Sequence, residues 1–242
     1  MDAIKTVGLT KKYRDVTAVD GLELTVPSGE LLALLGVNGA GKTTTVKMLS
    51  GLTAPTAGDA YLCGKSICRE PAAVKRMIAL SPQETAVAPA LTVRENLMLM
   101  AGVHGFDKEK TAEKLRELTA QMGLAAVADK KAGKLSGGWQ RRLSIAMALI
   151  SEPQILFLDE PTLGLDVLAR SELWDIIRAL KGAVTVILTT HYMEEAEALA
   201  DRVAIMREGR LLLCDTAENI KRCAGAERFE EAFIRIVKEV AE

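Results

Sequence analysis

The sequence predicts an α/β fold with a mixed, largely parallel sheet, an antiparallel β edge subdomain and an inserted α-helical subdomain. Three observations carry this prediction. Short apolar runs end at polar or glycine-rich points, an alternating segment near the start closes in a turn, and residues 84–152 change to helical spacing. With 242 residues, of which 49% are hydrophobic, the chain is long enough to bury a sizeable core.

Four apolar runs predict the strands of the main sheet. They are residues 31–35, 77–80, 155–158 and 184–189. None of them alternates between apolar and polar residues, which is typical of strands covered on both faces. A parallel sheet between two layers of helices is the expected arrangement.

Two other segments predict antiparallel pairing. Residues 22–26 alternate between apolar and polar side chains, and Pro27-Ser28-Gly29 follows as a turn, so we expect an edge sheet beside the main one. Residues 202–206 and 210–214, on either side of Glu208-Gly209, have the same pattern. The sheet is therefore expected to be mixed.

The segment between the second and third core strands predicts helices. Thr92 and Glu95 form a capping box, and Asp107 caps a run with leucines at helical spacing. We expect one domain in which residues 1–83 and 153–216 form the core and the β subdomain. Residues 84–152 form the helical subdomain, and residues 217–242 form a C-terminal helical tail.

A glycine-rich loop follows the first core strand directly and precedes a helix with apolar periodicity. Its sequence, Gly-Val-Asn-Gly-Ala-Gly-Lys-Thr, fits the G-x-x-x-x-G-K-[ST] pattern of a phosphate-binding loop. Glycines let backbone N–H groups turn toward phosphates, the lysine supplies a positive charge, and the threonine hydroxyl suits Mg²⁺. A chance match is the alternative, and the strand-loop-helix context argues against it. The candidate nucleotide-binding residues are Gly36, Asn38, Gly39, Ala40, Gly41, Lys42, Thr43 and Thr44.

Polar residues end three further core strands. Asp159 and Glu160 follow the third strand, where Asp159 can hold Mg²⁺ and Glu160 can orient and deprotonate an attacking water. His191 follows the fourth strand and can donate a hydrogen bond to the γ-phosphate, and Gln83 follows the second. Each of these residues alone has a structural alternative, such as a strand cap. Because the carboxyl ends of parallel strands meet at one edge, their convergence predicts one catalytic crevice.

A second anion-ready helix start lies in the helical insert. Leu135-Ser136-Gly137-Gly138-Trp139-Gln140 precedes an apolar-periodic helix, for which Ser136 is the expected N-cap. It has no evident route to the phosphates held in its own chain, so a second copy of the protein is the expected recipient.

With this segment the chain resembles the ATP-binding cassette (ABC) ATPases, whose signature Leu-Ser-Gly-Gly-Gln is matched except at Trp139. The resemblance runs nearly end to end and implies a P-loop NTPase (RecA-like) core. It makes Gln83 the Q-loop residue and a ligand of Mg²⁺ together with Thr43 and Asp159. Asp159 and Glu160 become the Walker B pair, and His191 becomes the switch histidine.

The resemblance also implies how the protein works. Two such domains close head to tail over two ATP molecules, so Ser136, Gly137 and Gly138 would act on the partner's nucleotide. Tyr13 would stack on adenine, with a strand-end aromatic as the alternative reading. Asp166, in the D-loop, would touch the other half. Leu163 stands where serine is frequent in that loop.

The most similar group is the stand-alone ATPase subunits of ABC-2-type exporters. The expected function is therefore ATP hydrolysis that drives a separate integral membrane permease, with a second ATPase subunit, identical or homologous, as the other partner.

No apolar run approaches the roughly 18 to 20 residues of a membrane span, and the N-terminus lacks a signal peptide. We expect a cytoplasmic protein bound peripherally to the plasma membrane through its permease. Residues 84–100 would grip the permease, or else form only the insert's own core.

Two rival functions use related sequences. A soluble cassette ATPase of translation or DNA repair usually has two cassettes or a long coiled-coil insert, and 31 basic against 32 acidic residues here give no strong field for nucleic acid. A GTPase or small-molecule kinase would share the phosphate loop, but the chain has no Asn-Lys-x-Asp guanine-reading sequence. We expect no nucleic-acid partner.

Overall fold

The computed structural model describes residues 1–239; the last three residues of the expected helical tail lie outside the described part. The strands are β1 (Asp2–Tyr13), β2 (Val16–Leu22), β3 (Thr25–Pro27), β4 (Leu31–Leu35), β5 (Ala57–Leu62), β6 (Lys65–Ser66), β7 (Ile78–Ser81), β8 (Ile155–Asp159), β9 (Thr185–Thr190), β10 (Arg202–Arg207) and β11 (Arg210–Asp215). The helices are α1 (Lys42–Leu49), α2 (Pro71–Lys75), α3 (Val93–Val103), α4 (Lys108–Gln121), α5 (Gly137–Leu149), α6 (Val167–Arg178), α7 (Met193–Leu199), α8 (Ala217–Cys223) and α9 (Phe229–Glu239), with short 3₁₀ turns at Ala125–Val127 and Ala132–Lys134.

The main sheet has six strands in the order β11-β10-β4-β9-β8-β7. Neighbours from β10 to β7 pair in parallel, and β11 pairs with β10 in the antiparallel direction. The sheet is thus mixed and largely parallel. The four predicted core strands are β4, β7, β8 and β9, with ends that differ from the predicted ones by one residue where they differ.

The second sheet is antiparallel, with the order β2-β1-β5-β6 and β3 paired to β1. It is the expected edge sheet. The late strand pair is also antiparallel, but β10 lies beside β4, so this pair extends the main sheet instead of forming a separate one.

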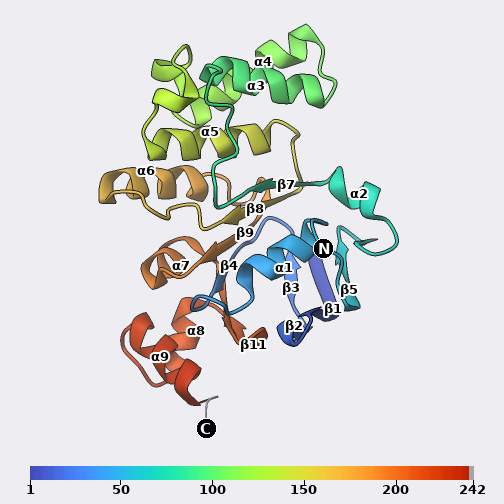
Figure 1. Cartoon of the computed structure of the whole chain (residues 1–242). Helices are drawn as coiled ribbons and strands as arrows, with labels where there is room; N and C mark the ends of the chain where they lie inside the picture. Colours follow the sequence, from blue (N-terminus) through green and yellow to red (C-terminus); the bar gives the residue numbers. More distant parts are fainter. Residues whose placement is uncertain (240–242) are drawn as a thin grey trace.

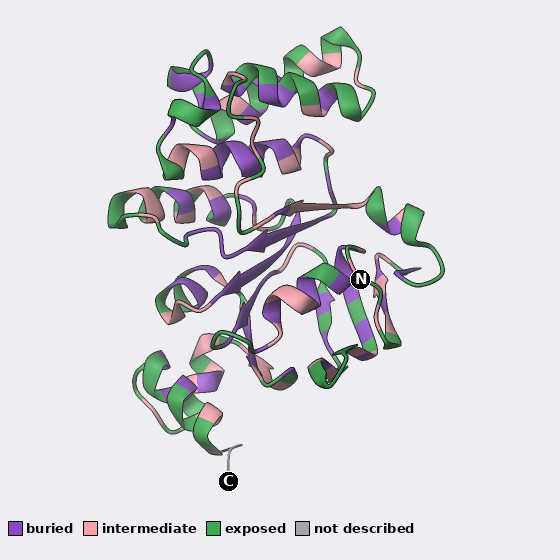
Figure 2. Cartoon of the chain, viewed as in Figure 1, coloured by how far each residue is buried: buried purple, intermediate pink, exposed green. Residues whose placement is uncertain are grey.

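Three apolar cores hold these elements together, and the buried residues follow the central strands in Figure 2. One core joins α3 to α6 to one face of the main sheet. A second core packs α1 and the antiparallel sheet against the opposite face. The third joins α7, α8 and α9 to β4 and β10. Side chains alternate between the two faces of β4, so Leu32 and Leu34 join the second core. On the other face Leu31 joins the first core, and Ala33 and Leu35 join the third.

Helices α3, α4 and α5 gather at one end of the molecule, away from β1, β2 and β5, while α8 and α9 lie at the other end (Figure 1). The predicted caps of this helical group are confirmed. Thr92 and Glu95 make both hydrogen bonds of a capping box, and the Asp107 side chain accepts from Lys110 N. Within residues 1–239, no helix combines the length and the apolar character needed to cross a membrane.

Candidate functional site

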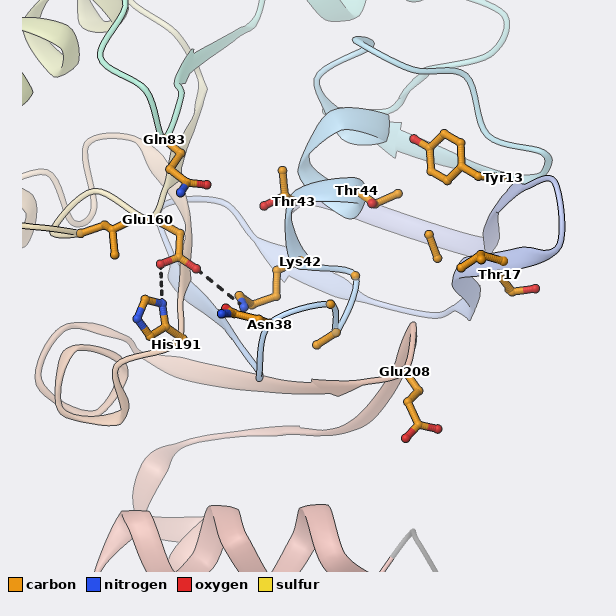
Figure 3. Close-up of a pocket in the computed structure, with 16 residues that line it drawn as sticks. Tyr13, Thr17, Asn38, Lys42, Thr43, Thr44, Gln83, Glu160, His191 and Glu208 are labelled. Atoms are coloured by element: carbon orange, nitrogen blue, oxygen red, sulfur yellow. Dashed lines mark hydrogen bonds and ion pairs between the residues drawn. The ribbon is translucent and has the colours of Figure 1, made fainter.

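The carboxyl ends of four parallel strands meet around one cavity. The strands β4, β9, β8 and β7 are neighbours in this order, and the segments that follow them carry the predicted site residues. The cavity has a volume of about 800 Å³. Its lining residues include Lys42, Gln83, Glu160 and His191, which face the same space in Figure 3. The predicted convergence of these four residues is therefore found in the structure.

The glycine-rich loop between β4 and α1 has the conformation of an anion-binding turn. Gly39 and Gly41 have φ angles of 82° and 101°, a region that glycine enters without strain. A side chain would not fit at Gly36, where a Cβ would lie 2.4 Å from Met206 O, or at Gly41, where it would lie 2.5 Å from Ala18 O. The loop therefore presents backbone N–H groups and the N-terminus of α1 to the cavity.

Lys42 is the cation of this loop. Its side chain is buried, its ammonium donates to Gly36 O at 2.7 Å and to Val37 O at 3.3 Å, and it lies 3.7 Å from a Glu160 oxygen. Burial lowers the pKa of Lys42, against the opposing charges of Glu160 and Asp159. The carboxylates of Glu160 and Asp159 thus favour the charged form of Lys42, and its ammonium lies where phosphates would bind.

Asp159 lies behind the loop and is held by two hydroxyl groups. Thr43 Oγ1 donates to Asp159 Oδ1 at 3.2 Å, and Thr189 Oγ1 donates to the same oxygen at 2.5 Å. Thr43 and Asp159 thus place a hydroxyl and a carboxylate side by side. Hard oxygen donors of this kind are the ligands that Mg²⁺ prefers.

Glu160 is held in an unusual backbone conformation. Its φ is 49°, and its N–H points back to Thr189, donating to the backbone oxygen at 3.1 Å and lying 3.0 Å from the hydroxyl. Its carboxylate lies 2.5 Å from His191 Nδ1. Because an ionised carboxylate only accepts, Nδ1 carries the proton of this bond, and Nε2 remains for another partner. The pair is preorganised in the cavity (Figure 3).

Gln83 is positioned through its backbone. The buried Arg141 on α5 donates to Pro82 O at 2.6 Å and to Gln83 O at 2.5 Å. Burial lowers the pKa of Arg141, while the charges of Asp159 and Glu195 oppose that shift. Arg141 therefore ties the helical group to the segment after β7, and sequence reasoning did not identify it.

Tyr13 lies at the rim of the cavity, at the end of β1. Its side chain is 46% exposed, and the Lys11 ammonium lies 4.9 Å from the centre of its ring. Thr17, Ala18 and Glu208 also line this part of the cavity and were not predicted. No local pattern marks them, because β2 and the β10–β11 turn reach the site only through tertiary packing.

The signature segment does not line the cavity of its own chain. Ser136 occupies the N-cap position of α5, as predicted, but its side chain makes no capping hydrogen bond. Ser136 and Gly137 are exposed and Gly138 is partly exposed. The hydroxyl and the first N–H groups of α5 are therefore available to an anion brought by another molecule.

Comparisons with known proteins agree with these features. Residues 19–163 match the protein family described as "ABC transporter". The chain is 43% identical over 225 residues to the daunorubicin/doxorubicin resistance ATP-binding protein DrrA of Streptomyces peucetius, covering 93% of this chain and 68% of that one. It is 44% identical over 201 residues to the Nod factor export ATP-binding protein I of Burkholderia lata, covering 83% and 66% of the two chains.

Among solved structures, the chain resembles an ATP-binding subunit of an ABC transporter. The TM-score is 0.85 with 28% sequence identity, and the match covers 97% of this chain and 99% of the other. The P-loop NTPase core with an antiparallel edge sheet and a helical insert is therefore the fold of this chain.

Proposed function

This chain belongs to the ABC transporter family as an ATP-binding, ATP-hydrolysing subunit, and we propose that it drives an exporter-type transporter by closing head to tail with a second ATPase subunit. The observation that carries the proposal is the meeting of Lys42, Glu160, His191 and Gln83 in one cavity, with the signature segment outside it. The relatives named for drug resistance and Nod factor export support the exporter type.

In this proposal the ATP phosphates lie over residues 39–44. The left-handed glycines, the N-terminus of α1 and the buried ammonium of Lys42 support this placement. On ATP binding, the Lys42 ammonium would donate to phosphate oxygens in place of the carbonyl oxygens of Gly36 and Val37. Tyr13 at the rim would stack on adenine.

The same proposal assigns Mg²⁺ to Thr43, Asp159 and Gln83. The hydroxyl and the carboxylate that already touch each other fit this ion, and the amide of Gln83 lies across the cavity from them. Bound Mg²⁺ would neutralise charge that develops on the phosphates. Because Arg141 fixes the backbone of Gln83, a shift of the helical group would move this ligand.

Hydrolysis is assigned to Glu160 and His191. Glu160 would orient the attacking water and accept its proton, and His191 would hold the Glu160 carboxylate through Nδ1 while Nε2 meets a phosphate oxygen. The positive φ of Glu160 is strain at a residue that touches the reacting atoms, which supports a catalytic role.

The exposed signature segment supports a second subunit as a partner, identical or homologous. Ser136, Gly137 and Gly138 would cap the nucleotide held by that partner, and Asp166 at the start of α6 would lie in the same interface. A membrane permease is the other proposed partner. Residues 84–100, which include the exposed Met98 and Leu99, would contact it and hold the protein at the cytoplasmic face of the membrane.

The experiment that tests this function changes Ser136 to Arg. The bulky cation would block the signature segment without touching the phosphate loop of the same chain. We expect monomer affinity for a fluorescent ATP analogue within twofold of wild type, no ATP-dependent dimer in size-exclusion chromatography, and turnover lower by about 10²- to 10³-fold. Ser28→Arg, at an exposed turn before β4, is the matched control. Normal ATP-dependent dimers of Ser136→Arg would contradict the head-to-tail arrangement.

A second prediction concerns Tyr13. Tyr13→Ala removes the proposed stacking surface, which is worth about 1–3 kcal/mol per base, so nucleotide affinity should fall roughly 5- to 150-fold. Tyr13→Phe keeps the ring and should bind within twofold of wild type. Titration with the fluorescent analogue measures both. Equal affinity of the Ala and Phe variants would assign Tyr13 to the structure of the strand end instead.

A further inference from the structure

A buried carboxylate that the proposed mechanism does not use lies on α7, four residues after His191. Glu195 is fully buried. One of its oxygens accepts a hydrogen bond from Trp174 Nε1 on α6 at 3.1 Å. Its other oxygen, Oε2, is buried and has no hydrogen-bond partner in the described part of the chain. Such groups are rare in native proteins, and each one calls for an explanation.

Two more buried polar atoms without a partner among residues 1–239 belong to the neighbours of Glu195. They are Thr162 Oγ1, two residues after Glu160, and Arg170 Nε on α6. The hydroxyls of Thr190 and Thr162, the Trp174 indole and the Arg170 charge all act on the Glu195 carboxyl. We call Glu195, Thr162, Arg170, Trp174 and Thr190 the Glu195 cluster. It joins the segment that carries His191 to the segment between Glu160 and α6.

Aromatic contacts connect this cluster to the catalytic pair. The Arg170 guanidinium lies 4.7 Å from the centre of the Tyr192 ring, and the Tyr192 ring lies 4.1 Å from the His191 ring. His191 in turn contacts Glu160. A displacement of Arg170 on α6 thus reaches His191 through a single side chain, that of Tyr192.

The carboxylate at this position is costly for the fold. Burial raises the pKa of Glu195 in spite of the opposing hydroxyl, indole and guanidinium groups. A glutamine would accept the Trp174 hydrogen bond without burying a charge. A fold that needed only this hydrogen bond would not need the acid.

The segment that Glu195 faces also has an exposed apolar side. Leu163 is 37% exposed, and Val167 and Leu168, in the first turn of α6, are 78% and 76% exposed. Adjacent exposed aliphatic side chains favour coverage by another protein surface. In the proposed dimer the second subunit would cover this side of residues 163–168.

We propose that Glu195 is a positioning residue that transmits the placement of residues 162–170 to His191, so that closure of the dimer sets the catalytic pair. This inference rests on the proposed dimer. Among the described residues of the separate chain, neither Glu195 Oε2 nor the Thr162 hydroxyl has a hydrogen-bond partner of normal geometry, although the hydroxyl is near enough to stabilise the carboxylate. In this proposal a small shift of Thr162 on closure completes the hydrogen bond. The cluster then has two arrangements, which is what a transmitting element requires.

Glu195→Gln tests this role in the full-length chain, with Glu194→Gln, an exposed glutamate of the same helix, as the matched control. We expect kcat of Glu195→Gln to fall roughly 10-fold, the usual effect of losing a group that orients a reacting residue. KM and affinity for the fluorescent ATP analogue should stay within twofold. The melting temperature at neutral pH should equal or exceed that of wild type, because the amide avoids the cost of a buried charge. Glu194→Gln should match wild type in all four quantities.

A second variant approaches the same contact from the other side. Thr162→Val removes the unpaired hydroxyl at nearly constant volume, so it should fold and also lower kcat severalfold. Because both variants break one contact, the double variant should be no slower than the slower single variant. This variant decides the matter if Glu195→Gln does not fold.

Several outcomes would overturn the inference: wild-type kcat in Glu195→Gln, effects of the two variants that multiply, or a loss of kcat that follows a lower melting temperature. If the wild-type chain hydrolyses ATP and forms ATP-dependent dimers, and Glu195→Gln has the same kcat, the inference is wrong but the proposed function stands. A wild-type chain that neither hydrolyses ATP nor dimerises would contradict the proposed function and, with it, this inference.

Discussion

Glu160→Gln is expected to lower ATP turnover by about 10²- to 10⁴-fold while the chain still binds ATP, which is the usual effect of removing a positioned general base. The amide keeps the size and shape of the carboxylate but cannot take up a proton. Most of the contacts proposed for the phosphates come from residues 39–44, which this change leaves in place. Steady-state hydrolysis and titration with a fluorescent ATP analogue measure the two effects separately.

The same variant should accumulate in the closed form. If hydrolysis reopens the dimer, a chain that binds ATP without cleaving it stays closed, and size-exclusion chromatography with ATP should show a larger dimer fraction than wild type gives. Glu113→Gln, an exposed change on α4, is the control for the loss of one negative charge. Turnover of Glu160→Gln within a few fold of wild type would assign the base to another residue.

The positions of the main strands and of the residues proposed to be catalytic could be predicted because their signals are local. A strand covered on both faces is buried along its whole length, as β4 and β9 are, and its apolar run is followed by a polar residue that marks its end. Because adjacent strands in the sheet are parallel, their carboxyl ends lie at the same edge, and no long-range contact has to be predicted to place them there. The convergence of Lys42, Glu160 and His191 therefore follows from strand ends and from the rule that such sheets bind ligands at their carboxyl edge.

The antiparallel sheet was harder to predict, because a single side chain interrupts it. Residues 22–26 alternate as one strand, but the structure divides them between β2 and β3. The Thr6 hydroxyl of β1 donates to Leu22 O and accepts from Leu24 N, both at 2.7 Å, and so replaces the backbone ladder at this point. No pattern within residues 22–26 contains that contact.

The supporting residues of the site were missed for a similar reason. Arg141 is a helix residue between other polar residues in the sequence, and Glu195 lies in a run of glutamates and alanines. From the sequence alone, both residues would be expected to be exposed side chains on the surface of a helix. Only tertiary packing buries Arg141 against the backbone of Gln83 and Glu195 against Trp174. Sequence motifs thus predicted residues that line the cavity, but not those that hold them in place.

Lys42→Ala is expected to weaken nucleotide binding itself, which distinguishes it from Glu160→Gln. Removing one member of a buried charged contact costs about 2–5 kcal/mol, so affinity for the fluorescent analogue should fall roughly 30- to 5000-fold. Part of this loss would come from Asp159 and Glu160, whose charges Lys42 offsets in the buried site. Without the ammonium, these two carboxylates repel the phosphates, and turnover falls because the site stays empty.

Lys47→Ala is the matched control, because Lys47 lies on the same helix with its side chain exposed. An exposed lysine five residues further along α1 contributes to the overall charge but lies outside the cavity lining, so its loss should change affinity less than twofold. The comparison separates a specific phosphate contact from general electrostatic attraction. If Lys42→Ala bound nucleotide as tightly as Lys47→Ala, the glycine-rich loop would hold the phosphates by its backbone alone. Lys42 would then neutralise Asp159 and Glu160 without contacting the ligand.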